Sequence, residues 1–225
     1  MNKISFIILA LALCCSIGAH AQSMGQIKSY ERLSAINKAR PEQNRKHQSV
    51  RKVLDAKVLD KTNRVVGQVQ DVVLDRSGGI NMINVDFDRL RLGIGVLPIN
   101  YGDLGVRPSN GSYKMSYSDD QLKEMLPSFL NDMSSASGEQ VNNFTVSKIM
   151  GRDVYAQDGK KIGRVVDVLF DRNGSRAEFL FVNMSERSVR GEKVAIPFAS
   201  PLYQNQKIIV KNDMAAGMVQ YAAEH

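Results

Sequence analysis

The stretch KVLDAKVLDKTNRVVGQVQDVVLDRSG, residues 52–78, recurs 96 residues later as KIMGRDVYAQDGKKIGRVVDVLFDRNG, residues 148–174, without a gap. A repeat at a fixed period indicates that one structural unit occurs twice in the chain. Nine pairs of positions are identical: Lys52/Lys148, Val58/Val154, Gly67/Gly163, Val69/Val165, Asp71/Asp167, Val72/Val168, Asp75/Asp171, Arg76/Arg172 and Gly78/Gly174.

Each copy predicts a β-hairpin. The segments 65–75 and 162–171 are rich in β-branched residues, and each runs into Asp-Arg-Ser-Gly or Asp-Arg-Asn-Gly, a type I turn pattern. A further strand follows at 80–87 and at 177–184. Many short strands in about 80 residues favour a small closed sheet, because closure removes unpaired edges.

The similarity resumes where VLPI, residues 96–99, matches AIPF, residues 195–198. Each copy then predicts another strand and a short closing helix. In the first copy Ser118 or Asp119 can cap this helix, and we expect Pro127 to help stop it. The polar segment 131–143 is typical of a linker. The predicted domains are therefore residues 51–130 and 144–225, with a mainly β fold in both.

The first 21 residues have the three parts of a secretory signal. Lys3 precedes an apolar run from Ile4 to Ile17, and Ala19-His20-Ala21 forms a cleavage site. We expect cleavage to leave Gln22 first, and a periplasmic or secreted protein without Cys14 and Cys15. The alternative is an uncleaved anchor in the inner membrane, because the uncharged stretch is just long enough to span a bilayer.

The formal net charge of +7 is concentrated in a basic N-terminal arm, residues 22–50, and in the two residues that follow it. Residues 53–225 are neutral, so we expect no nucleic-acid partner. A basic polar run is typical of a solvated linker, and the alternative is that its side chains contact an anionic membrane surface. The basic side chains are Lys28, Arg32, Lys38, Arg40, Arg45, Lys46, Arg51 and Lys52.

Histidine is the usual general base near neutral pH and the commonest metal ligand. His20 lies in the signal, His47 in a polar segment and His225 at the end, so we expect none in a folded part. We therefore expect a protein that is not an enzyme, with no catalytic residues, no cofactor-binding residues and no metal ligands.

Two glycines and two aspartates stand out within the repeat. Gly67 and Gly163 lie in the middle of strands, where glycine commonly marks a bulge. Strand alternation places Asp71 and Asp167 on the face of their apolar neighbours, so these carboxylates need partners. One interpretation is that they accept backbone N–H bonds near the hairpin, and the other is a cation site shared with Asp75 or Asp171.

On the basis of these residues, each copy of the repeat resembles the PRC-barrel domain family. The chain as a whole resembles the exported members of that family. The second copy has the Asp158-Gly159 turn and the strand that follows it, whereas the first copy has Thr62-Asn63 instead. The resemblance implies six-stranded barrels that act as adaptors and share no catalytic residues. The structural signature of the repeat is Gly67, Asp71, Asp75, Gly78, Pro98, Gly163, Asp167, Asp171, Gly174 and Pro197.

These observations predict a non-catalytic envelope protein that binds partner proteins, of unknown identity, as a scaffold. The alternative is a membrane-tethered adaptor with cytoplasmic barrels, similar in role to the photosynthetic reaction-centre H subunit. The two differ in topology, which depends on the fate of the N-terminal segment.

Overall fold

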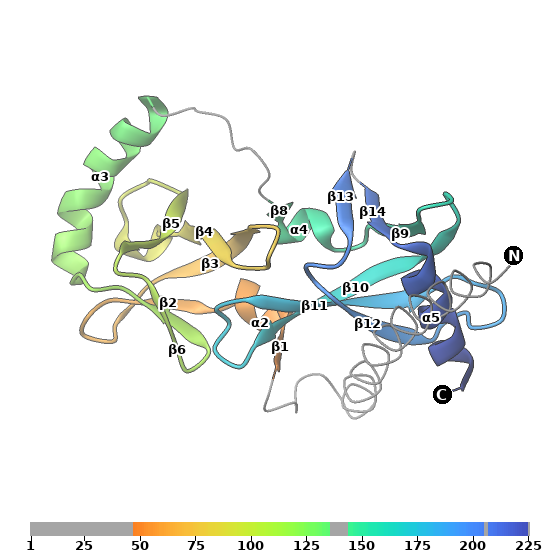
Figure 1. Cartoon of the computed structure of the whole chain (residues 1–225). Coiled ribbons are helices and arrows are strands. Elements are labelled where there is room, and N and C mark those ends of the chain that lie inside the picture. Colours follow the sequence, from red (N-terminus) through yellow and green to blue (C-terminus); the bar gives the residue numbers. More distant parts are fainter. Residues whose placement is uncertain (1–46, 136–143, 205–206, 225) are drawn as a thin grey trace, which may run out of the picture.

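The computed structural model describes residues 47–135, 144–204 and 207–224. Figure 1 shows two β-sheets side by side along the molecule, with one long helix near each end. A mainly β fold is therefore confirmed, and each copy of the repeat forms most of one sheet. Within these ranges no helix combines the length and the apolar character needed to cross a lipid bilayer.

The first sheet follows the order β5-β4-β3-β2-β7-β6, and β8 pairs with β3 in addition. Its elements are β2 (Lys57–Leu59), β3 (Val65–Leu74), β4 (Ile80–Asp86), the 3-10 helix η2 (Asp88–Leu90), β5 (Val96–Leu104), β6 (Arg107–Ser109), β7 (Ser112–Lys114) and α3 (Asp119–Ser135). Two short elements precede it in the chain: β1 (His47–Ser49) and α2 (Val50–Leu54).

The second sheet has the same topology, β12-β11-β10-β9-β14-β13, and here β1 pairs with β10 in addition. Its elements are β9 (Asp153–Ala156), β10 (Lys161–Asp171), β11 (Ala177–Met184), β12 (Lys193–Pro197), β13 (Leu202–Gln204), β14 (Lys207–Val210) and α5 (Asn212–Glu224). It too is preceded by two short elements: β8 (Phe144–Thr145) and α4 (Val146–Ile149).

Six strands of each sheet come from one copy, in the number that the resemblance implies. Neighbouring strands are antiparallel, except that β2 pairs with β7 and β9 with β14 in parallel. Among the described residues no backbone pairing joins β5 to β6 or β12 to β13. Closure of each sheet into a barrel therefore stays a prediction.

Gly67 and Gly163 lie beside irregularities in the pairing of β3 with β2 and of β10 with β9. A Cβ atom at Gly67 would lie 2.5 Å from the carbonyl oxygen of Asp86, and one at Gly163 would lie 2.5 Å from that of Asn183. Close approach of a neighbouring backbone therefore requires glycine at both positions. Neither glycine has a positive φ angle.

The helix α3 begins with a reciprocal cap. The Gln121 amide N–H lies 3.3 Å from Ser118 Oγ, and the Ser118 N–H donates to Gln121 Oε1 at 3.0 Å. The expectation that Pro127 helps stop this helix is wrong, because α3 continues through it to Ser135. A proline deprives a helix of one N–H donor, and here the turns on both sides remain helical.

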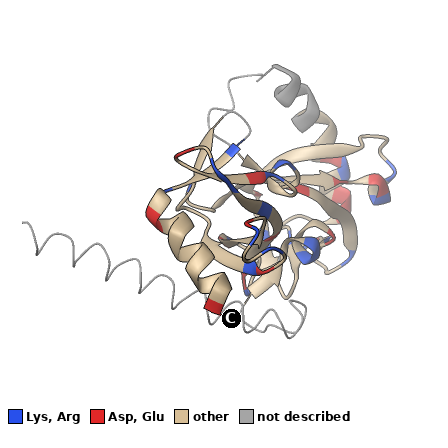
Figure 2. Ribbon diagram, turned by 90° about the vertical axis from the view of Figure 1, so that its right-hand side faces the viewer, with Lys and Arg blue, Asp and Glu red and all other residues tan. Residues whose placement is uncertain are grey.

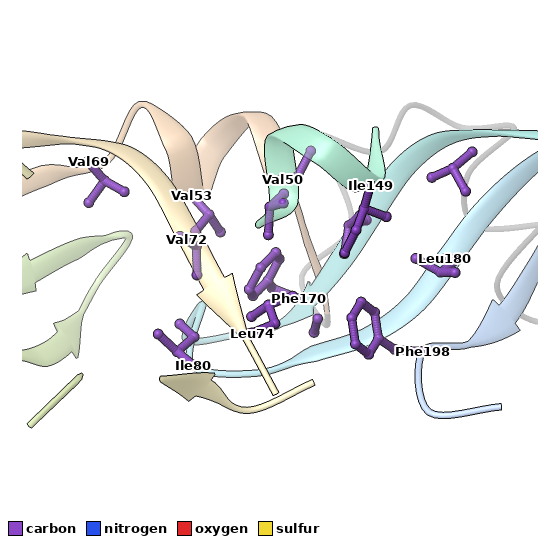
Figure 3. Close-up of a cluster of buried hydrophobic side chains, with 14 of the residues drawn as sticks. Val50, Val53, Val69, Val72, Leu74, Ile80, Ile149, Phe170, Leu180 and Phe198 are labelled. Carbon is purple, nitrogen blue, oxygen red and sulfur yellow. The ribbon is translucent and has the colours of Figure 1, made fainter. Parts of the chain in front are cut away.

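The apolar core runs through both copies without a break. Figure 3 shows Val50 and Val53 of α2, Ile149 of α4 and Phe170 of β10 gathered between the sheets. All four side chains are at most 3% exposed. Because burial of apolar surface is the main stabilising term, the two copies contribute to each other's stability.

Candidate functional site: the junction of the two copies

The two copies exchange their leading segments. The strand β1, which precedes the first copy, pairs antiparallel with β10 of the second, with His47 opposite Asp171. In return β8, which precedes the second copy, pairs with β3 of the first. Each sheet therefore gains its seventh strand from the other half of the chain.

Two aspartates of the repeat signature hold the exchanged segments. Asp167 Oδ1 accepts hydrogen bonds from Ser49 Oγ at 3.0 Å and from the Val50 N–H at 3.2 Å. Asp71 accepts from the Ser147 N–H at 3.2 Å and from the Ser147 hydroxyl. Backbone N–H donors near the hairpin were expected for both carboxylates, and Val72 and Val168 each donate such a bond at 2.8 Å within β3 and β10. The donors from the other copy were not expected.

The environment of Asp167 affects its ionisation. Burial raises the pKa of this carboxyl, and the hydrogen bonds from Ser49, Val50 and Val168 only partly oppose the shift. Asp75, the first residue of the hairpin turn, behaves in the opposite way. Burial would raise its pKa, but hydrogen bonds from Ser77 and Gly79 and the charge of Arg176 lower it.

The cation-site interpretation finds no support in the described ranges, where no group of three or more His, Cys, Asp or Glu side chains could hold a metal ion. The carboxylates of Asp75 and Asp171 are used within their own turns. Asp75 accepts from the Ser77 N–H at 2.7 Å, and Asp171 accepts from Ser175 Oγ at 2.6 Å.

The hairpin turns of the two copies meet at the junction. The Ala177 N–H donates to the Gly78 carbonyl at 2.8 Å, and Arg176 Nη2 donates to the Ser77 carbonyl at 3.0 Å. Gly78 has a φ of +89°, and a Cβ atom there would lie only 2.1 Å from the Ala177 carbonyl oxygen. The turn predicted from the sequence is therefore also a contact between copies.

A tyrosine pair of the first copy borders the second turn. Tyr113 Oη donates a buried hydrogen bond to the Gly174 carbonyl at 2.6 Å. The ring of Tyr101 packs edge-on against that of Tyr113, with centroids 6.4 Å apart. Burial, and secondarily the charge of Asp171, raises the pKa of Tyr101 to about 12. Burial also raises the pKa of Tyr113, so both phenols stay protonated near neutral pH.

His47 corrects the expectation that no histidine lies in a folded part. Its Nε2 lies 2.8 Å from Glu178 Oε2, and its ring packs edge-on against Phe179 at 5.6 Å between centroids. The polar surroundings of His47 in the sequence concealed its place in β1. It lies opposite β10 because the exchange carries it into the second sheet.

The predicted basic contact residues fall into two groups. Arg51 and Lys52 are exposed residues of α2, so they belong to the folded part of the chain. The other six, from Lys28 to Lys46, lie outside the described residues, as do the signal segment and its cleavage site.

The two prolines of the signature lie in terminal strands of the hydrogen-bonded order. Pro98 in β5 is opposite Asn84, and Pro197 in β12 is opposite Phe179. Proline lacks an N–H donor and is tolerated where a strand has one unpaired side.

Sequence reasoning missed Ser49, Ser147 and Tyr113, whose hydroxyl groups form hydrogen bonds across the junction. Ser49 does carry a signal, because it precedes the apolar-periodic residues of α2 as a helix cap does. Its partner in the other copy, however, lies 118 residues away in the sequence and could not be read from it.

Comparison with known proteins adds one match. Residues 141–215 match the PRC-barrel domain model, a segment that begins just before β8 and ends within α5. No curated protein matches the chain. The matched segment covers the six strands that the second copy contributes to the second sheet, together with β8, which pairs with the first. The second copy is thus similar to a PRC-barrel domain.

Proposed function

We propose that this protein is a non-catalytic scaffold of the cell envelope, in which two PRC-type modules bind partner proteins. The match over residues 141–215 supports an interaction module for the second copy. The identical strand order of the two sheets supports a second module of the same kind in the first copy, and we propose that each module closes into a small barrel.

The observation that carries this proposal is the shared junction. The two copies have one apolar core, and each lends a strand to the other. A fixed mutual orientation gives a partner two adjacent surfaces at a constant spacing, which lowers the entropic cost of binding both. The carboxylates Asp71 and Asp167 are used to keep that orientation.

Partner capture tests this role. The full chain, tagged at its C-terminus, is used to retain proteins from envelope fractions, and binding is then measured with each purified candidate. Val96 of β5 and Leu202 of β13 are large apolar side chains that are 51% and 52% exposed. We expect Val96→Glu or Leu202→Glu to weaken a specific partner at least tenfold, and Lys57→Glu at an exposed polar position to leave it unchanged.

The scaffold role would be contradicted if the chain retained no protein above the level found with an unrelated exported domain of the same size. Protease accessibility in intact cells separately tests export, since a chain facing the cytoplasm stays protected.

We also propose that the basic arm binds anionic surfaces. Replacement of Lys28, Arg32, Lys38 and Arg40 by glutamine should weaken binding of the full chain to vesicles containing anionic lipid, and rising salt should do the same. The control is Arg51→Gln with Lys52→Gln, in which α2 and not the arm loses two charges. Binding that is unchanged by the four arm replacements would show that the arm is a passive linker.

A further inference from the structure

A cleft of about 410 Å³ lies between α5 and the strands β9 and β10 of the second copy. Ala156, Ile162, Ala215 and Val219 give it an apolar wall, and Asp158 and Glu186 lie among its polar lining residues. An apolar recess with a few polar groups at its edge is a common form of binding site.

The first copy fills the corresponding places with its own side chains. Asp60 stands where the repeat has Ala156, is fully buried and accepts a hydrogen bond from the Asp119 N–H at 3.2 Å. The fourth and eighth residues of α3 are Leu122 and Leu126, both fully buried.

The same helix positions of α5 are Ala215 and Val219. Three positions of the second copy thus carry smaller side chains than the first, and all three line the cleft. Since the first copy accommodates leucine side chains beneath its closing helix, the space beside α5 suits apolar side chains of leucine or isoleucine size.

The charge around the cleft favours a basic occupant. The helix α5 contains Asp213 and Glu224 and has neither lysine nor arginine. Figure 2 shows this helix beside the C-terminus with red at both ends and tan between them. At the cleft itself, Lys160 forms an ion pair with Glu186 at 2.7 Å, so Asp158 remains as the further acidic lining residue.

The N-terminal arm has both required properties. Residues 22–46 carry six basic and two acidic side chains, and they include the apolar residues Leu33 and Ile36. The first described residue, His47, lies opposite Asp171 of β10. Ile162, which lines the cleft, is nine residues from Asp171 along the same strand, a distance of roughly 30 Å. Ile36 precedes His47 by eleven positions in the chain, enough to span up to roughly 36 Å when extended.

We propose that the arm docks on its own second copy, with Leu33 and Ile36 occupying the cleft beside α5. The basic side chains of the arm then lie along the acidic helix or face outward. The arm then provides apolar side chains at the places where α3 carries Leu122 and Leu126. They add to Met218 and Tyr221, which α5 itself buries.

Disulfide trapping tests the docking in the full chain, with Cys14→Ser and Cys15→Ser removing its only cysteines. Leu33→Cys is combined either with Ala216→Cys, an exposed position lining the cleft, or with Met125→Cys, an exposed position on α3. We expect the intramolecular disulfide to form at least tenfold faster with Ala216→Cys. Equal rates for the two pairs would overturn the proposal.

Two additional variants separate docking from general proximity. Ala215→Leu with Val219→Leu copies the first repeat into α5, and it should slow trapping at least tenfold by filling the cleft. Ile36→Gln lies in the arm, outside the described sheets and helices, and should slow trapping severalfold without changing the unfolding midpoint. Trapping that continues at the original rate in both variants would refute occupation of the cleft by the arm.

Discussion

The two hairpin turns of the junction have the same sequence pattern and different physical demands. Gly78 and Gly174 both have positive φ angles, of +89° and +73°. A Cβ atom at Gly78 would lie 2.1 Å from a backbone oxygen of the other copy, whereas at Gly174 the nearest atom is Tyr113 Oη at 3.5 Å. Both copies therefore keep the same turn. Only the first turn, at Gly78, packs closely against backbone atoms of the other copy.

A similar contrast separates the two opening turns. In the first copy Asp60 is buried, and its burial would raise its pKa, but hydrogen bonds led by that of Thr62 lower it to about 2. The second copy has Ala156 at this position and the cleft beside it. A single site of the repeat is thus a structural anchor in one copy and part of a cleft wall in the other.

The largest expected effect distinguishes the two turn glycines. Gly78→Ala should lower the free energy of unfolding by about 3 to 5 kcal/mol, because it combines an unfavourable φ with a clash against backbone. Gly174→Ala should cost about 1 to 2 kcal/mol, from the backbone conformation alone. Urea denaturation of both variants provides the measurement, and equal losses would mean that the junction is symmetric after all.

The strand glycines should behave alike. Gly67→Val and Gly163→Val each bring a side chain against a neighbouring carbonyl, so each should cost about 2 to 3 kcal/mol in unfolding free energy. Since the core is continuous, both variants should shift one common transition. Two separate transitions, with one moved by each variant, would show that the copies unfold independently.

Substitutions in the tyrosine pair test the hydrogen bond that Tyr113 of the first copy makes to the second copy. Tyr113→Phe removes the hydrogen bond to the Gly174 carbonyl and should cost about 1 kcal/mol of unfolding free energy. The matched control is Tyr101→Phe, because the Tyr101 hydroxyl is buried without a hydrogen-bond partner among the described residues. That variant should be neutral or slightly stabilising, and a loss equal to that of Tyr113→Phe would contradict the assignment.

The smallest effect concerns pH. The folded-state pKa of Asp167 lies above the unfolded value of about 3.8, so protonation favours the folded state. As the pH rises from the unfolded-state pKa to the folded-state pKa, the free energy of unfolding of the protein with Asp167 should fall relative to that of Asp167→Asn. Thermal unfolding of both proteins from pH 3.5 to pH 7 measures this difference, and a pH-independent difference would show that burial of Asp167 has no effect on its ionisation.

Much of the fold could be predicted from the sequence because it depends on local patterns. The β-branched segments and the Asp-x-x-Gly turns correctly indicated β3, β10 and the hairpins that they begin. The exchange of leading segments was not predictable, because β1 and β8 are only three and two residues long. Their partners are determined by packing between copies and not by a local period.

The same reason explains what was missed at the junction. Asp71 and Asp167 were recognised as carboxylates that need partners, since strand alternation alone places them on an apolar face. The donors that reach them from the other copy, Ser147 and Val50 with Ser49, lie in segments whose position depends on packing between copies. His47 was misjudged for the same reason, because only pairing with β10 brings it against Glu178.

The exchange of leading segments also imposes an order on folding during synthesis. A ribosome releases Ser49 long before Asp167, which follows 118 residues later, so the first segment must wait without its partner strand. The second segment emerges when β3 has already been made. Such distant pairing slows folding, because the chain must close a long loop before the contact stabilises it. The first copy therefore completes its contacts only after the second has emerged.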